Sequence, residues 1–131
     1  MPNVRCDDRS FLLDDQRIWL TSGSIHYFRV PHQLWRDRLL KARRAGLNCV
    51  STFAAWNVHE PEEGKWNFEG DADLPAFVEA ASDVGLYVIL RPGPYIGAEW
   101  DFGGLPAWLA TKSGMAVRTN NAHYTHYLDK Y

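Results

Sequence analysis

Apolar and polar positions follow extended and helical periods along most of this chain. Residues 11–30 contain two extended apolar runs separated by an Asp-Asp pair, so they predict a short hairpin that leads into a longer strand. Pro31 is expected to end that strand and to open a helix. Across 32–47 the apolar residues recur at helical spacing, most basic residues fall on other faces, and Gly46 is a suitable stop.

Two further strands and a helix are predicted from the middle of the chain. The run 48–53 is rich in β-forming residues and shows little alternation, which is typical of a strand buried on both faces. The next helix has Asp71 or Asp73 as its cap, carries one apolar stripe and closes at Gly85. The run 86–91 is again typical of a buried strand.

Long polar and aromatic loops follow these strands, at 54–71 and 92–115. A last helix is predicted to begin at Asn120 or Asn121 and to be still running at Tyr131. This order of strands and helices indicates parallel α/β architecture. A doubly wound sheet and a (β/α)8 barrel both fit it, although no Gly-x-Gly-x-x-Gly motif supports a dinucleotide site. A barrel builds its active site from loops after the strands and needs about 250 residues, so this chain would hold about three of its eight units.

Composition narrows the classes of function. The 131 residues suffice for one domain, and 46% of them are hydrophobic. A net charge of -2, with both signs interspersed, argues against a nucleic-acid partner or a polybasic membrane surface. No apolar stretch could span a bilayer, and the first residues lack an export signal, which favours the cytoplasm while leaving the compartment open. Cys6 and Cys49 have no metal or redox spacing, and no cofactor is expected.

Two glutamates lie just after predicted strands, Glu60 and Glu99. Glycoside hydrolysis needs a pair of carboxylates, about 5–5.5 Å apart in retaining enzymes, and neighbouring strands lie about 4.8 Å apart. Spacing therefore allows a catalytic pair, but most loop carboxylates are solvated, capping or salt-bridged. Four of the six tryptophans lie in or beside predicted loops: Trp56, Trp66, Trp100 and Trp108. Loop indoles can either bind a sugar face or pack the loops onto the core.

The histidines add less to the chemistry. His26 and His59 could line the same mouth, but neither belongs to a triad or a metal-ligand pattern. His123 and His126 are three residues apart on the last predicted helix and could share a metal ion. Because no acidic or sulfur ligand lies nearby in the sequence, an exposed helix face is favoured and no metal site is predicted.

Four segments carry a family resemblance. SGSIHYFRVP at 22–31, the helix at 34–48, WNVHEPEEGKWNF at 56–68 and above all RPGPYIGAEWDFGGLPAWL at 91–109 closely resemble β-galactosidases of glycoside hydrolase family 35. The resemblance runs in order over essentially the whole chain. It implies that 1–131 is the N-terminal part of a (β/α)8 barrel that hydrolyses terminal, non-reducing β-D-galactose with retention of configuration.

The resemblance also implies roles for single residues. Glu99 would hold galactose hydroxyls, Ala98 would contribute a backbone contact, and Tyr95 and Gly97 would shape the same loop. Both catalytic carboxylates of such enzymes would lie beyond Tyr131, so the resemblance withdraws the catalytic pairing of the two glutamates and assigns no catalytic residue to this chain.

One departure concerns the end of the second predicted strand. The family usually has tyrosine where this chain has Phe53, and that hydroxyl reaches the sugar. Phe53 keeps the ring without the hydrogen bond, which puts the glycan preference in doubt. Ala55 is smaller than the residue often found there, which would widen the mouth.

Two other interpretations remain beside a galactoside hydrolase. A non-catalytic galactose-binding fragment would keep the sugar-holding loop without catalytic machinery. A truncated chain without independent function is favoured over it, because the last predicted helix is unfinished and three barrel units would leave sheet edges uncovered.

Overall fold

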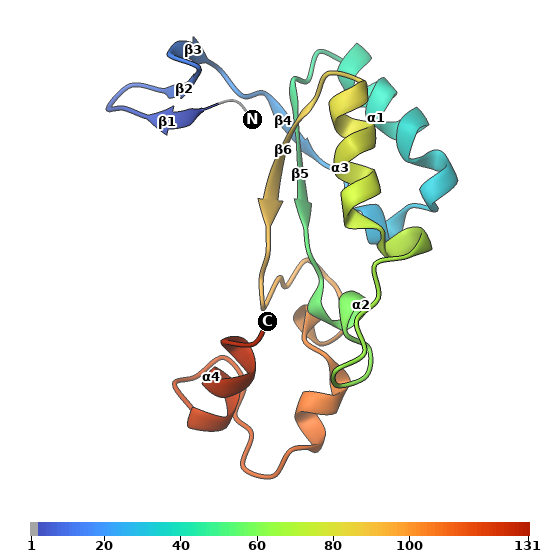
Figure 1. The fold of residues 1–131 in the computed structure, drawn as a ribbon, viewed down its shortest axis with the longest axis vertical. Helices are drawn as coiled ribbons and strands as arrows, with labels where there is room; N and C mark the ends of the chain where they lie inside the picture. The colour runs from blue at the N-terminus through green and yellow to red at the C-terminus, as the bar shows by residue number, and fades with distance from the viewer. Residues whose placement is uncertain (1–2) are drawn as a thin grey trace.

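The computed structural model describes residues 3–131 and contains two three-stranded sheets (Figure 1). One sheet is antiparallel in the order β1-β2-β3, and the other is parallel in the order β4-β5-β6. The strands are β1 (Val4–Cys6), β2 (Phe11–Leu13), β3 (Gln16–Ile18), β4 (Ser22–Ser24), β5 (Cys49–Phe53) and β6 (Tyr87–Arg91). The helices are α1 (Trp35–Arg44), α2 (Trp56–His59), α3 (Leu74–Asp83) and α4 (Ala122–Leu128).

The predicted hairpin is confirmed as β2 and β3. Leu13 pairs with Gln16, so Asp14 and Asp15 form a two-residue loop, with φ angles of 48° and 67°. Both angles lie in the left-handed region that short polar residues tolerate and that a two-residue hairpin turn requires. Strand β1, which the sequence did not predict, adds a third strand to this small sheet.

The prediction of a longer strand before Pro31 is wrong. Strand β4 ends at Ser24, and the chain continues through 3-10 turns at Tyr27–Arg29 and His32–Leu34 before α1 begins. The Trp35 indole N–H donates to the carbonyls of Tyr27 and Val30, at 3.1 and 2.9 Å. The indole therefore satisfies backbone acceptors that a continued strand would have paired with a neighbour.

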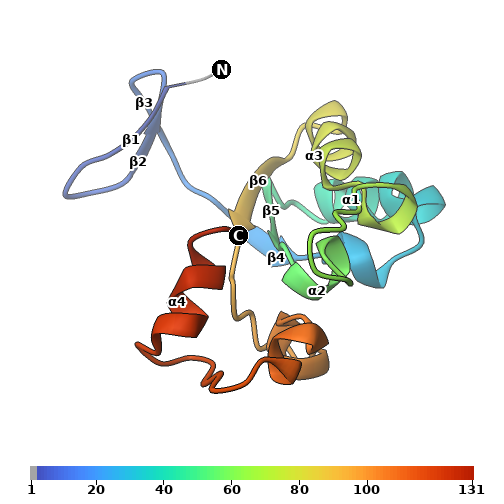
Figure 2. The same ribbon diagram turned by 60° about the horizontal axis from the view of Figure 1, so that its bottom comes forward.

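Helices α1 and α3 cover one face of the parallel sheet (Figures 1 and 2). Asp73 caps α3 by accepting a hydrogen bond from the Ala76 N–H at 2.9 Å, as one of the two predicted caps would. The core between these helices and the sheet consists of Tyr27, Trp35, Leu39, Val50, Phe77, Ala81 and Leu86. This burial fixes the position of β5 at the centre of the sheet.

Strands β5 and β6 differ in burial, although the sequence predicts both to be buried on both faces. In β5, Cys49, Val50 and Thr52 are fully buried. In β6, Tyr87 and Leu90 are 45% and 44% exposed, so the prediction is wrong for this strand. Strand β6 lies at the edge of the sheet, where no strand among residues 3–131 pairs with its outer side.

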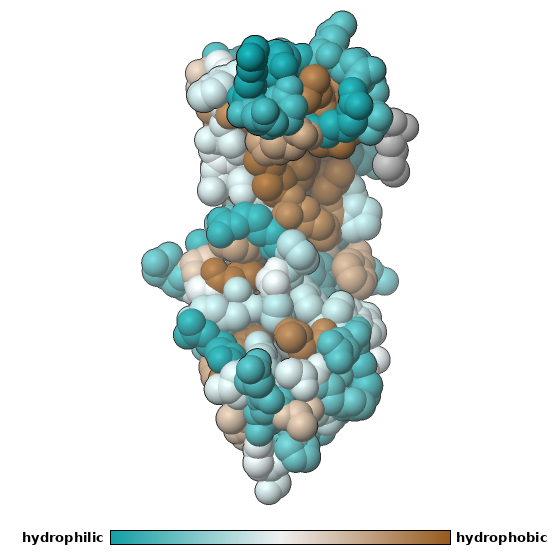
Figure 3. All heavy atoms as spheres, turned by 90° about the vertical axis from the view of Figure 1, so that its left-hand side faces the viewer, coloured by the Kyte–Doolittle hydropathy of each residue, from teal (hydrophilic) through white to brown (hydrophobic). Residues whose placement is uncertain are grey.

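An apolar groove of about 630 Å³ runs along that edge. Its walls come from the antiparallel sheet, from β6 and from α3. Figure 3 shows apolar side chains gathered on this side of the molecule, beneath the more polar hairpin.

The chain after β6 gathers at the carboxyl ends of the parallel strands (Figure 1). The helix predicted to begin at Asn120 or Asn121 is confirmed as α4, and the Asn121 side chain caps it by accepting hydrogen bonds from the N–H groups of His123 and Tyr124. The prediction that this helix still runs at Tyr131 is wrong, because it ends at Leu128. The Tyr131 hydroxyl donates to the Pro92 carbonyl at 2.6 Å and so ties the last residues to the end of β6.

No helix among residues 3–131 is both long enough and apolar enough to cross a membrane.

Candidate functional site

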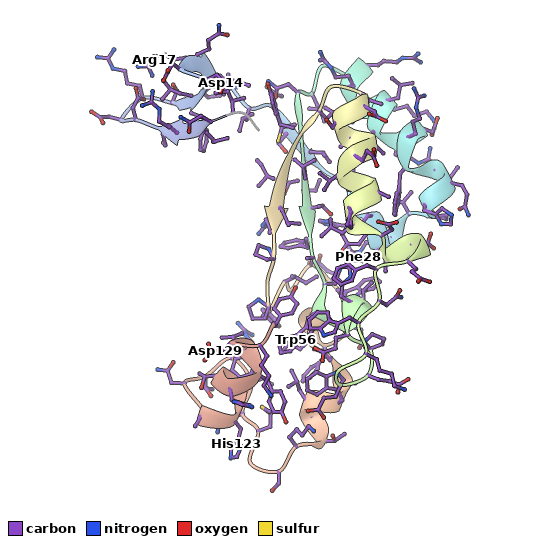
Figure 4. The ribbon with its side chains drawn as sticks, in the orientation of Figure 1. Asp14, Arg17, Phe28, Trp56, His123 and Asp129 are labelled. Atoms are coloured by element: carbon purple, nitrogen blue, oxygen red, sulfur yellow. The ribbon has the colours of Figure 1, made fainter. Side chains whose placement is uncertain are left out.

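Three loops meet where the parallel strands end. They comprise residues 25–31 after β4, 54–73 after β5 and 92–121 after β6, and parallel strands place such loops at the same edge of a sheet. Figure 4 shows Phe28 and Trp56 from two of these loops near the ends of β5 and β6. The aromatic and charged residues singled out from the sequence therefore share one end of the sheet.

Phe53, the last residue of β5, lies between the ends of the two other strands. It pairs with Arg91, whose guanidinium carbon lies 4.0 Å from the centre of the Phe53 ring. The His26 ring lies 5.1 Å away on the other side. Successive strand residues face opposite sides, so the ring lies on the face opposite Val50, which packs in the core beneath the helices. Phe53 is partly exposed there rather than enclosed in the core.

His26 completes this group with a neutral ring. Burial, with smaller contributions from Arg29 and Arg91, lowers the pKa of His26 below its usual value. Its Nδ1 accepts the backbone N–H of Phe53 at 3.4 Å. That contact leaves the ring proton on Nε2, so the imidazole offers one donor at the strand ends.

The Gly97-Ala98-Glu99 turn has an unusual backbone conformation. The three residues have φ angles of 62°, 55° and 47°, all in the left-handed region. Left-handed backbone costs an ordinary L-residue roughly 1–2 kcal/mol, and such strain is found most often at functional sites. The Glu99 side chain is exposed and Ala98 is partly buried, so the turn presents its carboxylate to solvent.

Tyr95 is held from both sides. A Cβ built on Gly103 would meet the Tyr95 ring at 2.0 Å, so only glycine fits against this face. The Arg118 guanidinium carbon lies 4.0 Å from the ring centre. Backbone hydrogen bonds from Ile96 and Gly97 to the Gly103 carbonyl, at 2.8 and 3.3 Å, close the same loop. Sequence reasoning named Tyr95 but missed Gly103 and Arg118.

Trp100 fixes the loop after β6 to the two other loops. Its indole N–H donates to Asn57 Oδ1 at 3.0 Å, and the Asn57 side chain in turn donates to the Asp101 carbonyl at 3.3 Å. Its ring meets Phe28 edge-on at 4.8 Å. Sequence reasoning gave Asn57 and Phe28 no role, because partners 43 and 72 residues apart leave no local pattern in the sequence.

Glu60 is occupied by structural hydrogen bonds. One carboxylate oxygen accepts the Trp56 indole N–H at 2.5 Å, and the other accepts the Gly64 backbone N–H at 2.7 Å. Its backbone carbonyl accepts the Trp108 indole N–H at 3.0 Å, and the residue is 7% exposed. These contacts favour the structural interpretation of Glu60 over a role in a catalytic pair with Glu99.

His59 also has a structural environment. The Tyr27 hydroxyl lies 2.5 Å from His59 Nε2, while His59 Nδ1 donates to the Asn67 carbonyl at 2.9 Å. Nε2 is therefore the acceptor of the Tyr27 proton. Burial lowers the pKa of His59, so this buried ring is neutral near pH 7.

Residues 3–131 contain no group of three or more His, Cys, Asp or Glu residues that could hold a metal ion. His123 and His126 both lie on α4 and are exposed to solvent, and His123 points away from the sheet (Figure 4).

Known proteins resemble this chain in sequence and in fold. The model of the glycosyl hydrolases family 35 matches residues 10–131. Human beta-galactosidase-1-like protein 2 is 54% identical over 122 residues, which are 93% of this chain and 19% of that protein. Bovine beta-galactosidase is 54% identical over 121 residues, covering 92% of this chain and 18% of its own length. The chain thus spans about a fifth of the length of these curated relatives.

Two solved structures share the fold at low sequence identity. The beta-galactosidase of psychrophilic Marinomonas ef1 has a TM-score of 0.56 and 22% identity, covering 71% of this chain and 13% of that one. GH5_18 from Streptomyces cattleya, in complex with GlcNAc, has a TM-score of 0.65 and 20% identity, covering 86% of this chain and 28% of that one. These structures support the mixed α/β fold, and the match over 10–131 shows that the chain belongs to the glycosyl hydrolases family 35.

Proposed function

We propose that residues 1–131 form the N-terminal part of a (β/α)8-barrel catalytic domain that hydrolyses terminal β-D-galactose from β-galactosides with retention of configuration. The family match over 10–131 carries this proposal. Three parallel strands with helices on one face correspond to about three of the eight barrel units. The loops that hold the candidate site follow the carboxyl ends of the strands, where barrel enzymes build their active sites.

Within this domain the described residues bind the sugar rather than break its bond. Glu99 accepts hydrogen bonds from galactose hydroxyls, the Ala98 backbone adds a contact, and Tyr95 and Gly97 shape the turn. The exposed Glu99 side chain on a preformed turn supports this assignment. No catalytic role falls to Glu60, whose oxygens are both occupied, so the acid/base and the nucleophile come from other barrel units.

Phe53 lines the same sugar site with an apolar ring. Its partly exposed position beside His26 and Arg91 supports a place at the barrel mouth. No metal ion or cofactor takes part in the proposed reaction, since two carboxylates suffice for retaining hydrolysis.

A chimera tests the proposal directly. Residues 10–131 of this chain replace the matching segment of bovine beta-galactosidase, which is 54% identical. The expected result is turnover of a chromogenic β-galactoside, with β-galactose as the first anomer seen by proton NMR. A chimera with a cooperative melting transition but no turnover would contradict the proposal.

A matched pair of substitutions locates the sugar contact in that chimera. Glu99→Gln should raise KM for galactosides, whereas Glu79→Gln, at an exposed glutamate of α3, should leave KM unchanged. Equal kinetics for both variants would remove Glu99 from the proposed site.

A further inference from the structure

The turn that carries Glu99 receives part of its support from outside its own loop. Gly97, Ala98 and Glu99 all adopt left-handed φ angles, and only the first of them is glycine. Within the loop, the N–H groups of Ile96 and Gly97 donate to the Gly103 carbonyl, and the Trp100 N–H donates to the Gly97 carbonyl at 3.0 Å across the turn. The carbonyl groups of Ala98 and Glu99 accept no backbone N–H within the described residues.

Arg29 provides that support from the loop after β4. Its Nη2 donates to the Ala98 carbonyl and, at 3.3 Å, to the Glu99 carbonyl. These partners are 69 and 70 residues apart in the sequence. A guanidinium can serve two acceptors at once because its N–H groups are fixed in one plane.

The guanidinium is itself held in place by aromatic rings. Its central carbon lies 5.2 Å from the Trp100 ring and 5.8 Å from the Phe28 ring, within the range of cation–π attraction. Trp100 is fixed in turn by its hydrogen bond to Asn57. The Arg29 side chain is exposed, yet these contacts restrict where its donors can point.

We propose that Arg29 is a positioning residue for sugar binding, which holds the Gly97–Glu99 turn in its left-handed conformation and so fixes where the Glu99 carboxylate lies. The inference rests on the proposed function, because it takes Glu99 as the sugar-binding group. Without Arg29 the turn relaxes toward ordinary backbone angles, and only a fraction of molecules present Glu99 correctly. The apparent affinity for the sugar falls by that fraction.

The kinetic test uses Arg29→Ala and Arg29→Lys in the bovine chimera. For Arg29→Ala, KM for a β-galactoside and the inhibition constant of free galactose should both rise about 10-fold, the low end for a hydrogen bond from a charged donor. The kcat value should change much less. Both constants of Arg29→Lys should lie between those of the wild-type chimera and of Arg29→Ala, because an ammonium group keeps the charge without the planar arrangement of donors. Arg36→Ala, at an exposed arginine of α1, is the matched control and should change neither constant.

Hydrogen exchange tests the turn itself in the folded chimera. Peptides covering 96–103 should exchange faster in Arg29→Ala than in wild type, while peptides from α3 keep their rates. A lower melting temperature with unchanged KM would show a merely structural role and overturn the proposal, as would unchanged exchange at 96–103. A folded but inactive wild-type chimera would count against the proposed function alone, because hydrogen exchange does not require turnover and would still decide whether Arg29 holds the turn.

Discussion

Substitution of Glu60 tests whether its carboxylate has a structural or a catalytic role. Glu60→Gln keeps the size of the side chain but turns one oxygen into an NH2 group. Both oxygens accept N–H donors, from Trp56 at 2.5 Å and from Gly64 at 2.7 Å. Whichever way the amide is rotated, its NH2 group faces another donor.

The cost follows from those two contacts. One hydrogen bond to a charged acceptor is lost, and a buried donor is left without a partner, so the substitution should destabilise the domain by about 2–3 kcal/mol. Glu62→Gln is the matched control, since the Glu62 side chain is 69% exposed and pairs only with Lys65 at the surface. Its effect should stay within about 0.5 kcal/mol.

Both variants are made in the bovine chimera and compared by thermal unfolding and by the pH profile of kcat/KM. Glu60→Gln should lower Tm by several degrees, and the activity that remains should keep both limbs of its pH profile. An unchanged Tm together with a lost limb would show that Glu60 is an acid or a base, and the structural argument would fail.

Four further outcomes are expected. Glu99→Gln should weaken galactoside binding by about 1.5–3 kcal/mol without removing a limb of the pH profile, as inhibition by galactose and a pH series would show. Phe53→Tyr should raise kcat/KM for galactosides more than for glucosides, by the equivalent of about 0.5–1.5 kcal/mol in transition-state stabilisation. An equal ratio of variant to wild-type kcat/KM for both sugars would exclude a role of this position in sugar selection. The 131-residue chain alone should show neither turnover nor a cooperative monomeric melting transition, because it exposes the edge of β6; a sharp monomeric transition would favour a galactose-binding fragment. Burial lowers the pKa of His59 below its usual value of 6.5, so the unfolded state binds the proton more readily than the folded state. The free energy of unfolding should therefore fall as the pH drops from 6.5 toward the folded pKa. Melting curves between pH 7 and 5 should show that His59→Gln lacks this loss.

Local chemistry explains which elements the sequence predicted correctly. The turn at Asp14 and Asp15, the Asp73 cap and the Asn121 cap each depend on residues within a few positions of one another. Such signals survive in a single sequence because the interaction and the pattern occupy the same short segment. The 3-10 turns before α1 were missed because they depend on the Trp35 indole, which satisfies carbonyl groups up to eight residues earlier.

In the candidate site, too, the sequence indicated the residues of local motifs but not their distant partners. The resemblance named Tyr95 and Glu99, but it did not name the residues that fix their positions. Arg29 comes from the distant loop after β4, and Gly103 packs on Tyr95 from a later part of the loop after β6. Glu60 gave the opposite error, since strand spacing allowed a carboxylate pair that the Trp56 and Gly64 donors now disfavour. Position after a strand places a side chain near the site, whereas its hydrogen-bond partners decide what it does there.

Strand β6 shows why burial is harder to predict than structure. The run from Leu86 to Arg91 has the composition of a strand covered on both faces, and it does form a strand paired along its length with β5. Its exposed Tyr87, Ile89 and Leu90 show that composition reflects the surroundings for which the segment was selected, not those that residues 3–131 provide. Apolar side chains at 40–45% exposure gain only part of the stabilisation that full burial would give, so covering this edge should stabilise the strand further. The same argument links the stability of β6 to the proposed sugar site, because β6 leads directly into the loop that carries Glu99. An edge that is free to move would loosen the turn that Arg29 contacts from the loop after β4.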